Sequence, residues 1–277
     1  MNLLKTLTLI IIFASASFAV FDSSFPDAVS SAMGDIPSSI GPGPNSLFEG
    51  EGIAAGGGYR RSFNYADFDE LAGWASWSDS KFGRALLNVS SYSVPDISSE
   101  TRFALGYSRH LFADIHTELD LAVKANLLSL SYGESTDGID LGSTMGASFD
   151  FAARALIYDR TSVFILVDNL TATNLGVEGD IEVPRAVTGA IGYSPYTNTN
   201  MVFHVRREAG RDFTYGLGIS AEPHEIITFR LGAATNPDRI TGGIGLKYNI
   251  FRFDYGLKSH PVLPLSHTIN LGINLVR

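Results

Sequence analysis

Apolar and polar residues alternate along most of this chain. Near the C-terminus, Ile269, Leu271 and Ile273 occupy every second position, and Thr268 and Asn270 lie between them. A period of two is typical of a β-strand with one apolar and one polar face. The pattern therefore predicts an all-β fold.

Segments with this alternation recur from residue 52 to the end of the chain, and most have the ~9–11 residues that cross a bilayer at a tilt. We expect about 14 strands, since tilted antiparallel strands of this length build closed barrels. They fall near 52–62, 70–78, 82–93, 100–109, 117–131, 145–157, 161–168, 186–194, 200–208, 212–221, 226–234, 239–248, 251–259 and 267–277.

The first residues have the features of an export signal. Lys5 supplies a positive charge, Leu7–Phe13 an apolar core, and Ser17-Phe18-Ala19 a small-residue cleavage site. The apolar core is too short to span a bilayer. We therefore predict a cleaved signal peptide at 1–19, an irregular plug-like segment at 20–50 that is rich in Pro, Ser and Gly, and a barrel at 51–277.

Two closed all-β architectures fit this alternation: a soluble exported β-sandwich and a transmembrane β-barrel. A sandwich exposes a face rich in Lys, Glu and Thr, whereas a barrel turns small and paired charged residues into its lumen. Here the polar faces carry mainly Gly and small residues, with charges of both signs, which favours the barrel. The predicted lumen-lining residues are Glu118, Asp120, Lys124, Asp150, Arg154, His204, Arg230, Lys247, Arg252 and Asp254.

The lengths of the connections also favour a barrel. With a periplasmic N-terminus, connections from even to odd strands are periplasmic turns, and many of them, such as Asp79–Lys81, are short. The two longest connections, Tyr132–Thr144 and Asn169–Arg185, fall on the outer side, as in bacterial barrels. Two predicted turns, His110–His116 and Pro195–Thr199, are longer than this pattern expects.

Aromatic residues gather at the predicted strand ends, where the interfaces of a bilayer would lie. Those beside predicted turns are Tyr158, Tyr193, Tyr196, Tyr248 and Phe251, and those near predicted outer loops are Phe63, Tyr65, Tyr92, Tyr132 and Phe213.

Composition excludes several other classes of protein. The 277 residues carry a net charge of −9, only 18% charged residues and no cysteine, and the mean hydropathy is +0.11. A disordered acidic chain would be less apolar, and a nucleic-acid-binding protein would be basic. Disulfide scaffolds and thiolate metal sites are excluded outright. The expected location is the outer membrane of a Gram-negative-type bacterium.

Several short motifs, most of them in the second half, resemble the PorV/PorQ family of outer-membrane barrels, which are similar in architecture to FadL-type transporters. The matching residues are Ser31–Gly34, Asp168–Leu170, Val183–Arg185, Gly192–Pro195, Gly216–Gly218, Arg230–Gly232, Thr235–Arg239, Gly243–Leu246, Phe253–Gly256, Ser259–Pro261 and Leu265–Gly272. The resemblance implies a barrel of 14 strands. It also implies a role as an accessory component of type IX secretion for some members.

The chain departs from that family at two places. Pro44-Asn45-Ser46-Leu47 only faintly matches the family's conserved stretch before the first strand, so we expect a shortened or rebuilt plug. The chain also ends in Arg277 instead of the aromatic residue that commonly serves as the assembly signal.

No catalytic, cofactor or metal site emerges from the motifs. His260 and His267 flank one predicted hairpin loop, and we interpret them as loop-stabilising residues. The glycines of Ala55–Gly58 lie inside a strand pattern and not between a strand and a helix, as a nucleotide site would require. The segment Ser162–Val167 is apolar on both faces, which predicts either an apolar lumen patch or packing on the plug.

The main functional prediction is a secretion-associated or structural outer-membrane barrel, which is not an enzyme. The alternatives are a FadL-like transport channel for hydrophobic small molecules and the soluble sandwich. The expected partners are outer-membrane lipid and either secretion-system components or a hydrophobic ligand, and no nucleic acid.

Overall fold

The computed structural model describes Phe21 and residues 25–50, 52–64, 68–133, 142–176 and 181–275. The predicted signal peptide and Tyr65 lie outside the described residues.

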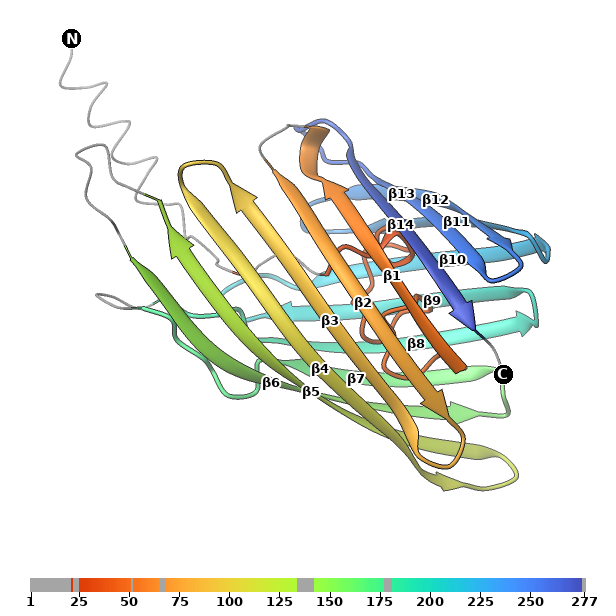
Figure 1. Cartoon of the computed structure of the whole chain (residues 1–277). Coiled ribbons are helices and arrows are strands. Elements are labelled where there is room, and N and C mark those ends of the chain that lie inside the picture. Colours follow the sequence, from red (N-terminus) through yellow and green to blue (C-terminus); the bar gives the residue numbers. More distant parts are fainter. Residues whose placement is uncertain are drawn as a thin grey trace, which may run out of the picture.

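Within the described residues, fourteen antiparallel strands form one closed barrel, in which each strand pairs with its neighbours in sequence (Figure 1). Pairing of β1 with β14, for example Gly57 with Leu271, closes the barrel. The predicted all-β barrel is confirmed, and the sandwich alternative is wrong. The strands are β1 (Gly52–Arg61), β2 (Asp69–Asp79), β3 (Gly83–Val94), β4 (Ser98–Ala113), β5 (Thr117–Tyr132), β6 (Ser143–Ile157), β7 (Thr161–Asp168), β8 (Ala186–Tyr196), β9 (Thr199–Glu208), β10 (Thr214–His224), β11 (Ile227–Ala234), β12 (Arg239–Tyr248), β13 (Phe251–Lys258) and β14 (Ser266–Leu275).

The barrel has two different rims. We call the rim with the even-to-odd connections, near the C-terminus in Figure 1, the turn end, and the opposite rim the loop end. The two connections that looked too long for turns are in fact short, because β4 continues to Ala113 and β8 to Tyr196. Pairing resumes after a register shift between His110 and Phe112 in β4. Such bulges let a strand extend despite an unpaired residue.

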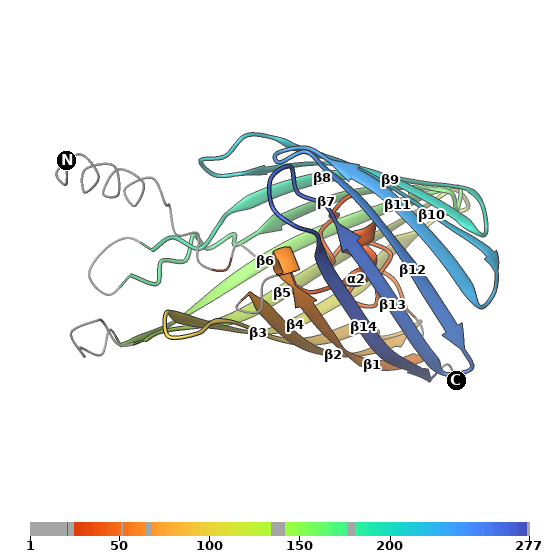
Figure 2. The ribbon, with the colours of Figure 1, turned by 90° about the horizontal axis from the view of Figure 1, so that it is seen from above.

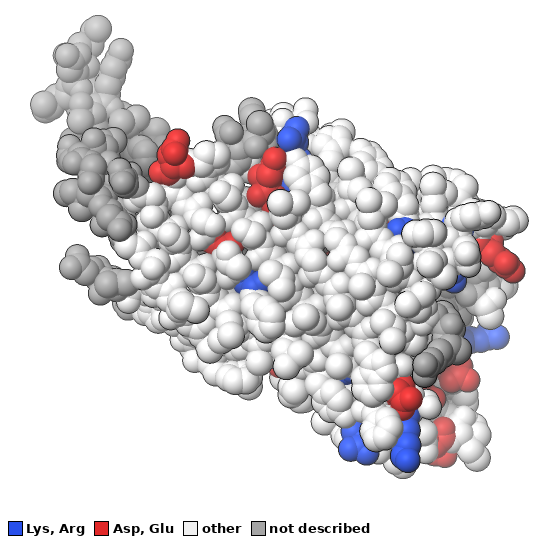
Figure 3. Space-filling model, in the orientation of Figure 1, with Lys and Arg blue, Asp and Glu red and all other residues white. Residues whose placement is uncertain are grey.

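The outer wall is apolar. On β5, Val123 and Leu127 point outward and are more than half exposed, whereas Asn126 between them is buried inside the barrel. Leu231 and Leu271 are likewise 68% and 61% exposed on the outside. Figure 3 shows charged side chains mainly toward the two ends of the molecule, with few between them. A continuous apolar belt of this kind is the surface that a bilayer solvates.

Among the described residues, no helix is long and apolar enough to cross a membrane.

The aromatic residues behave differently at the two rims. At the turn end, Tyr158, Tyr196 and Tyr248 are strongly exposed, as expected for an interfacial position. At the loop end, Tyr92 faces an internal cavity and Tyr132 packs against a buried apolar cluster. The prediction that these two residues serve the outer interface is therefore wrong, because both lie on the inward face of their strands.

The core of the protein lies inside the barrel (Figure 2). Residues 25–50, which include the short helix α2 (Ala28–Ala32), run through the lumen, and we call them the plug. Val29, Met33, Ile36 and Leu47 of the plug are almost completely buried. They form one apolar cluster with inward side chains of the wall: Leu86, Ala122, Ala152, Phe164, Leu166, Ala190 and Val202.

Candidate functional site

The plug begins with a buried helix cap. Oδ1 of Asp27 accepts hydrogen bonds from the backbone N–H groups of Val29 and Ser30, at 2.9 and 3.1 Å. Its second oxygen accepts a hydrogen bond from Asn45 Nδ2 at 2.9 Å, which ties the two ends of the plug together. Burial raises the pKa of Asp27, although these hydrogen bonds partly offset the rise.

Polar side chains of the wall satisfy the irregular backbone of the plug. Asn270 of β14 accepts a hydrogen bond from the N–H of Ala28 and donates one to the carbonyl of Pro26. Thr241 Oγ1 donates to the carbonyl of Ala32 and accepts from the N–H of Gly34, both at 2.9 Å. Buried backbone groups need such partners, so this hydrogen bonding fixes the height of the plug.

Farther round the wall, three strands from β14, Arg84 of β3 binds the end of the plug. Its Nε donates to the carbonyl of Ser46 at 2.9 Å, and its Nη2 donates to the carbonyl of Pro44 at 3.1 Å. Residues Pro44–Leu47, which faintly match the family motif, are therefore the part of the plug that a wall arginine binds.

Glycines in the wall let the plug approach closely. A Cβ added to Gly218 would lie 2.5 Å from the carbonyl oxygen of Met33, and one added to Gly256 would lie 2.5 Å from that of Ala28. Neither position can carry a side chain without displacing α2.

Two cations of the wall clamp the plug at its loop-end side. The carboxylate of Asp35 lies 3.0 Å from Arg239 Nη2 of β12 and 3.3 Å from Lys258 Nζ of β13. Burial alone would raise the pKa of Asp35, but Lys258 and Arg239 outweigh that effect and hold its pKa well below the usual range.

The predicted lumen charges form three groups in the wall. Asp120 pairs with Arg154 at 2.7 Å, and Lys124 pairs with Asp150 at 2.9 Å. Asp254, only 2% exposed, forms an ion pair with Arg230 at 2.9 Å and accepts a hydrogen bond from Arg252 Nε at 2.6 Å. Such pairing is what makes charges tolerable inside the barrel.

Three other predicted lumen residues lie elsewhere or alone. Lys247 is exposed at the turn end of β12, so the expectation that it faces a buried partner is wrong. Glu118 is half-buried near the start of β5. His204 of β9 is almost completely buried, and its Nδ1 has no hydrogen-bond partner among the described residues.

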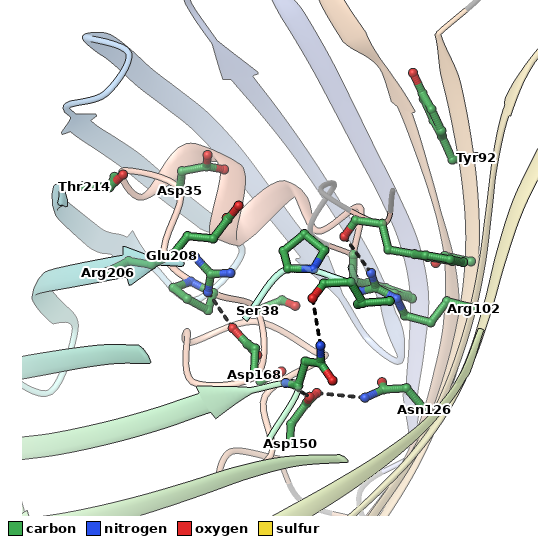
Figure 4. A pocket seen from close by; sticks show the side chains of 18 of the residues that line it. Asp35, Ser38, Tyr92, Arg102, Asn126, Asp150, Asp168, Arg206, Glu208 and Thr214 are labelled. Atoms are coloured by element: carbon green, nitrogen blue, oxygen red, sulfur yellow. Dashed lines mark hydrogen bonds and ion pairs between the residues drawn. The ribbon is translucent and has the colours of Figure 1, made fainter. Parts of the chain in front are cut away.

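A cavity of about 910 Å³ occupies the loop end of the lumen, above the plug (Figure 4). Its floor includes Asp35 and Ser39 of the plug, and its walls carry both polar and charged side chains. The apolar lining is provided mainly by Phe21, Phe25, Leu128 and Val183. The cavity therefore suits a ligand with polar and apolar parts.

The segment between β7 and β8 closes one side of this cavity, and Asn169 organises it. Its backbone N–H donates to Asp150 Oδ1 at 2.8 Å, its Nδ2 donates to the carbonyl of Val183 at 2.8 Å, and its Oδ1 accepts from Thr173 N–H at 3.1 Å. Asn169 has a positive φ of 50°, which Asn tolerates better than most residues. Leu175 and Val183 then pack against Phe21, Leu128 and Leu130.

The doubly apolar segment of β7 packs on the plug. Phe164 points inward, and its ring centroid lies 6.0 Å from that of Phe48, whereas Val163 and Ile165 point outward. Of the two alternatives for Ser162–Val167, packing on the plug is the one that the structure bears out.

The two loop histidines serve local structure. His260 Nδ1 lies 3.2 and 3.0 Å from the backbone nitrogens of Val262 and Leu263, and its ring meets the edge of Phe63. His267 Nδ1 lies 2.8 Å from the hydroxyl of Tyr255. In the described part of the chain, no cluster of three or more His, Asp or Glu residues is arranged to hold a metal ion.

Alternation alone did not single out the residues that matter most at the cavity. Asp35, Arg239 and Lys258 converge from segments far apart in the sequence, and Asn88 and Asn126 look like ordinary polar positions. The sequence did contain the motifs Asp168–Leu170 and Val183–Arg185, which flank the segment at the side of the cavity. In the structure a hydrogen bond from Asn169 Nδ2 to the carbonyl of Val183 joins these two motifs.

Solved structures with the same architecture are outer-membrane barrels. The toluene transporter TodX of Pseudomonas putida is 10% identical, with 92% of this chain and 98% of that chain covered and a TM-score of 0.57. A Pseudomonas aeruginosa FadL homologue is 9% identical, with 91% and 99% covered and a TM-score of 0.54. Omp33 of Acinetobacter baumannii is 10% identical, with 81% and 98% covered and a TM-score of 0.53.

No protein-family model matches the chain, and no curated protein matches it in sequence. The structural likeness therefore shows the fold of FadL-like outer-membrane barrels, without support specific to PorV/PorQ.

Proposed function

We propose that this protein is a plugged channel in the outer membrane of a Gram-negative-type bacterium, which takes up small molecules with apolar character. In this proposal the loop-end cavity receives the ligand and the plug gates its passage toward the turn end. The apolar belt supports membrane insertion, and the fold shared with TodX and a FadL homologue supports transport over a secretion role.

The observation that carries this proposal is the way the lumen is filled. The plug is held by an apolar cluster and by hydrogen bonds and ion pairs to wall side chains, and a large cavity remains on one side of it. A purely structural barrel needs no such cavity, since a plug and inward side chains together can fill its lumen.

A reversible cross-link between plug and wall tests the gate. Ser31 Oγ lies 3.3 Å from Thr268 Oγ1, and the chain has no native cysteine. In the double variant Ser31→Cys/Thr268→Cys, oxidation should join α2 to β14. We expect uptake of the fluorescent apolar probe N-phenyl-1-naphthylamine by intact cells to fall on oxidation and to recover on reduction.

Each single variant serves as the matched control and should respond to neither treatment. Equal uptake in the oxidised and reduced double variant would show that the ligand bypasses the plug. No uptake above that of cells lacking the protein would refute the channel itself.

The secretion-associated role implied by the PorV/PorQ resemblance stays a prediction. Its test is deletion of the gene followed by a comparison of exported proteins. Unchanged export would remove that role.

A further inference from the structure

One row of polar side chains crosses the cavity wall at a single height. Asn88 of β3 is in register with Ala104 of β4, Ala104 with Asn126 of β5, and Asn126 with Ser148 of β6. All four residues line the loop-end cavity, and each is less than a tenth exposed. We call this row the amide ledge.

Two hydrogen-bond acceptors of the amide ledge are not used by the described part of the protein. The side-chain oxygens of Asn88 and Asn126 are buried and have no hydrogen-bond partner among the described residues. Buried amide oxygens normally have a partner, so an unsatisfied pair on a cavity wall points to a ligand.

The orientation of Asn126 is fixed by its neighbours. Its Nδ2 donates to Asp150 Oδ2 at 3.0 Å and to Ser148 Oγ at 3.2 Å, which leaves the oxygen as the free end of the amide (Figure 4). Asp150 is itself held by Lys124 and by the N–H of Asn169. The acceptor is therefore positioned before any ligand arrives, which lowers the entropic cost of binding.

The two asparagines lie on opposite sides of a small residue. They are two strands apart, or ~10 Å between backbones, and the only side chain between them in the row is that of Ala104. A polar group about the size of a sugar ring can therefore reach both amides.

The charges of the cavity leave little attraction for an ionic ligand. Arg206 pairs with Asp168 at 2.6 Å, and Asp35 lies between Arg239 and Lys258. Lys124 is likewise taken by Asp150. These cations already have carboxylate partners, and the cavity-lining Arg102 donates to the carbonyl of Phe21 at 3.0 Å. A charged ligand would therefore have to give up its hydration for little gain.

An apolar surface adjoins the amide ledge. Leu128 follows Asn126 on the same inward face of β5, and it packs with Phe21 and Val183 at the cavity. A molecule with its polar end on the ledge would thus rest its apolar end against these residues.

We propose that the loop-end cavity binds a neutral amphipathic molecule whose hydroxyl or amide donors engage Asn88 and Asn126. This inference rests on the proposed channel function and narrows its substrate class from hydrophobic molecules in general. The apolar part of the ligand lies on Phe21 and Leu128.

Binding of phenyl β-glucoside by the full chain in lipid nanodiscs tests the site. This probe joins neutral hydroxyl donors to an apolar ring, toluene offers the ring without donors, and benzoate offers a charge. A neutral hydrogen bond contributes enough for Asn88→Ala or Asn126→Ala to weaken phenyl β-glucoside binding roughly 2- to 12-fold. Binding of toluene should not change in either variant.

Filling the ledge gives a second test with a matched control. Ala104→Leu places a larger side chain between the two amides and should abolish binding of phenyl β-glucoside. Ala125→Leu, on the outward face of the next strand, should leave binding unchanged. Folding of each variant is checked by the heat-modifiable gel shift of a folded barrel. If Ala104→Leu does not fold, Asn88→Ala still tests the site, because it leaves the hydrogen bonds of Asp150 intact.

The outcomes separate the site from the channel. Equal affinities in wild type, Asn88→Ala and Asn126→Ala would overturn the site, even if apolar probes are still taken up. Tight, ledge-dependent binding without any uptake would instead retain the site and refute the channel function. Failure of wild type to bind phenyl β-glucoside would also overturn the site.

Discussion

Asp35 of the plug and Arg239 at the start of β12 form an ion pair of 3.0 Å across 204 residues of sequence, and both line the loop-end cavity. Lys258 adds a second cation at 3.3 Å. This arrangement joins the plug, the wall and the candidate binding site through one carboxylate. Removal of the Asp35 carboxylate should therefore affect both the stability of the barrel and the gating of the proposed channel.

The variant Asp35→Asn should lower the free energy of unfolding by about 2 kcal/mol, between the costs for exposed and for buried pairs, because it leaves two partly buried cations without a counter-charge. Urea titration of the reconstituted barrel measures this loss. Asp69→Asn is the control, since Asp69 pairs with Arg61 at a partly exposed position and should cost less than about 1 kcal/mol. Equal losses in the two variants would contradict the clamp.

The same ion pair predicts a particular dependence on pH. The pKa of Asp35 is held below that of a free aspartate, so its contribution is fully present above about pH 4 and disappears only as the pH falls through the lowered value. The difference in unfolding free energy between wild type and Asp35→Asn should stay constant from about pH 8 to pH 5. A difference that already shrinks near pH 5 would show an ordinary or raised pKa.

Gly218→Ala should displace the plug, because the added Cβ would lie 2.5 Å from the carbonyl oxygen of Met33. We expect a loss of about 1–3 kcal/mol in unfolding free energy, as for other overpacked positions. Gly189→Ala is the matched control on the outward face of β8, where nothing lies within 4 Å of the new atom. The idea of close plug approach fails if both variants match wild type.

Asn169→Ala should loosen the segment between β7 and β8. The substitution removes the side-chain hydrogen bonds to Val183 and Thr173 and places alanine at a positive φ. Trypsin should then cleave after Arg185 roughly tenfold faster, which corresponds to about 1.4 kcal/mol of local stability. Asn198→Ala, in a turn at the other rim, is the control and should leave cleavage at Arg185 unchanged.

Much of the wall could be predicted from the residues, because each strand must show one face to apolar surroundings. The inward set on β5 and β6, with Asp120, Lys124, Asp150 and Arg154, pairs as expected. Lys247 was misplaced because alternation gives the face of a residue and not its height along the barrel. Tyr92 and Tyr132 were misplaced for a different reason, because they were judged by their position at a strand end and not by the face they share with inward neighbours.

The candidate site required the tertiary structure. Asn88 and Asn126 become a pair only when β3, β4 and β5 are in register, and their unused oxygens depend on how Asp150 orients one amide. Asp35 gains its cations only when the plug enters the lumen.

The sequence by itself determined the class of fold, the positions of the strands and which face of each is apolar, since a period of two and short turns are local properties. Only the tertiary structure decided what the lumen contains. The plug, the Asp35 clamp and the amide ledge arise from contacts between distant segments, such as Ala28 with Asn270, and closure of the barrel by β1 and β14 brings those segments together.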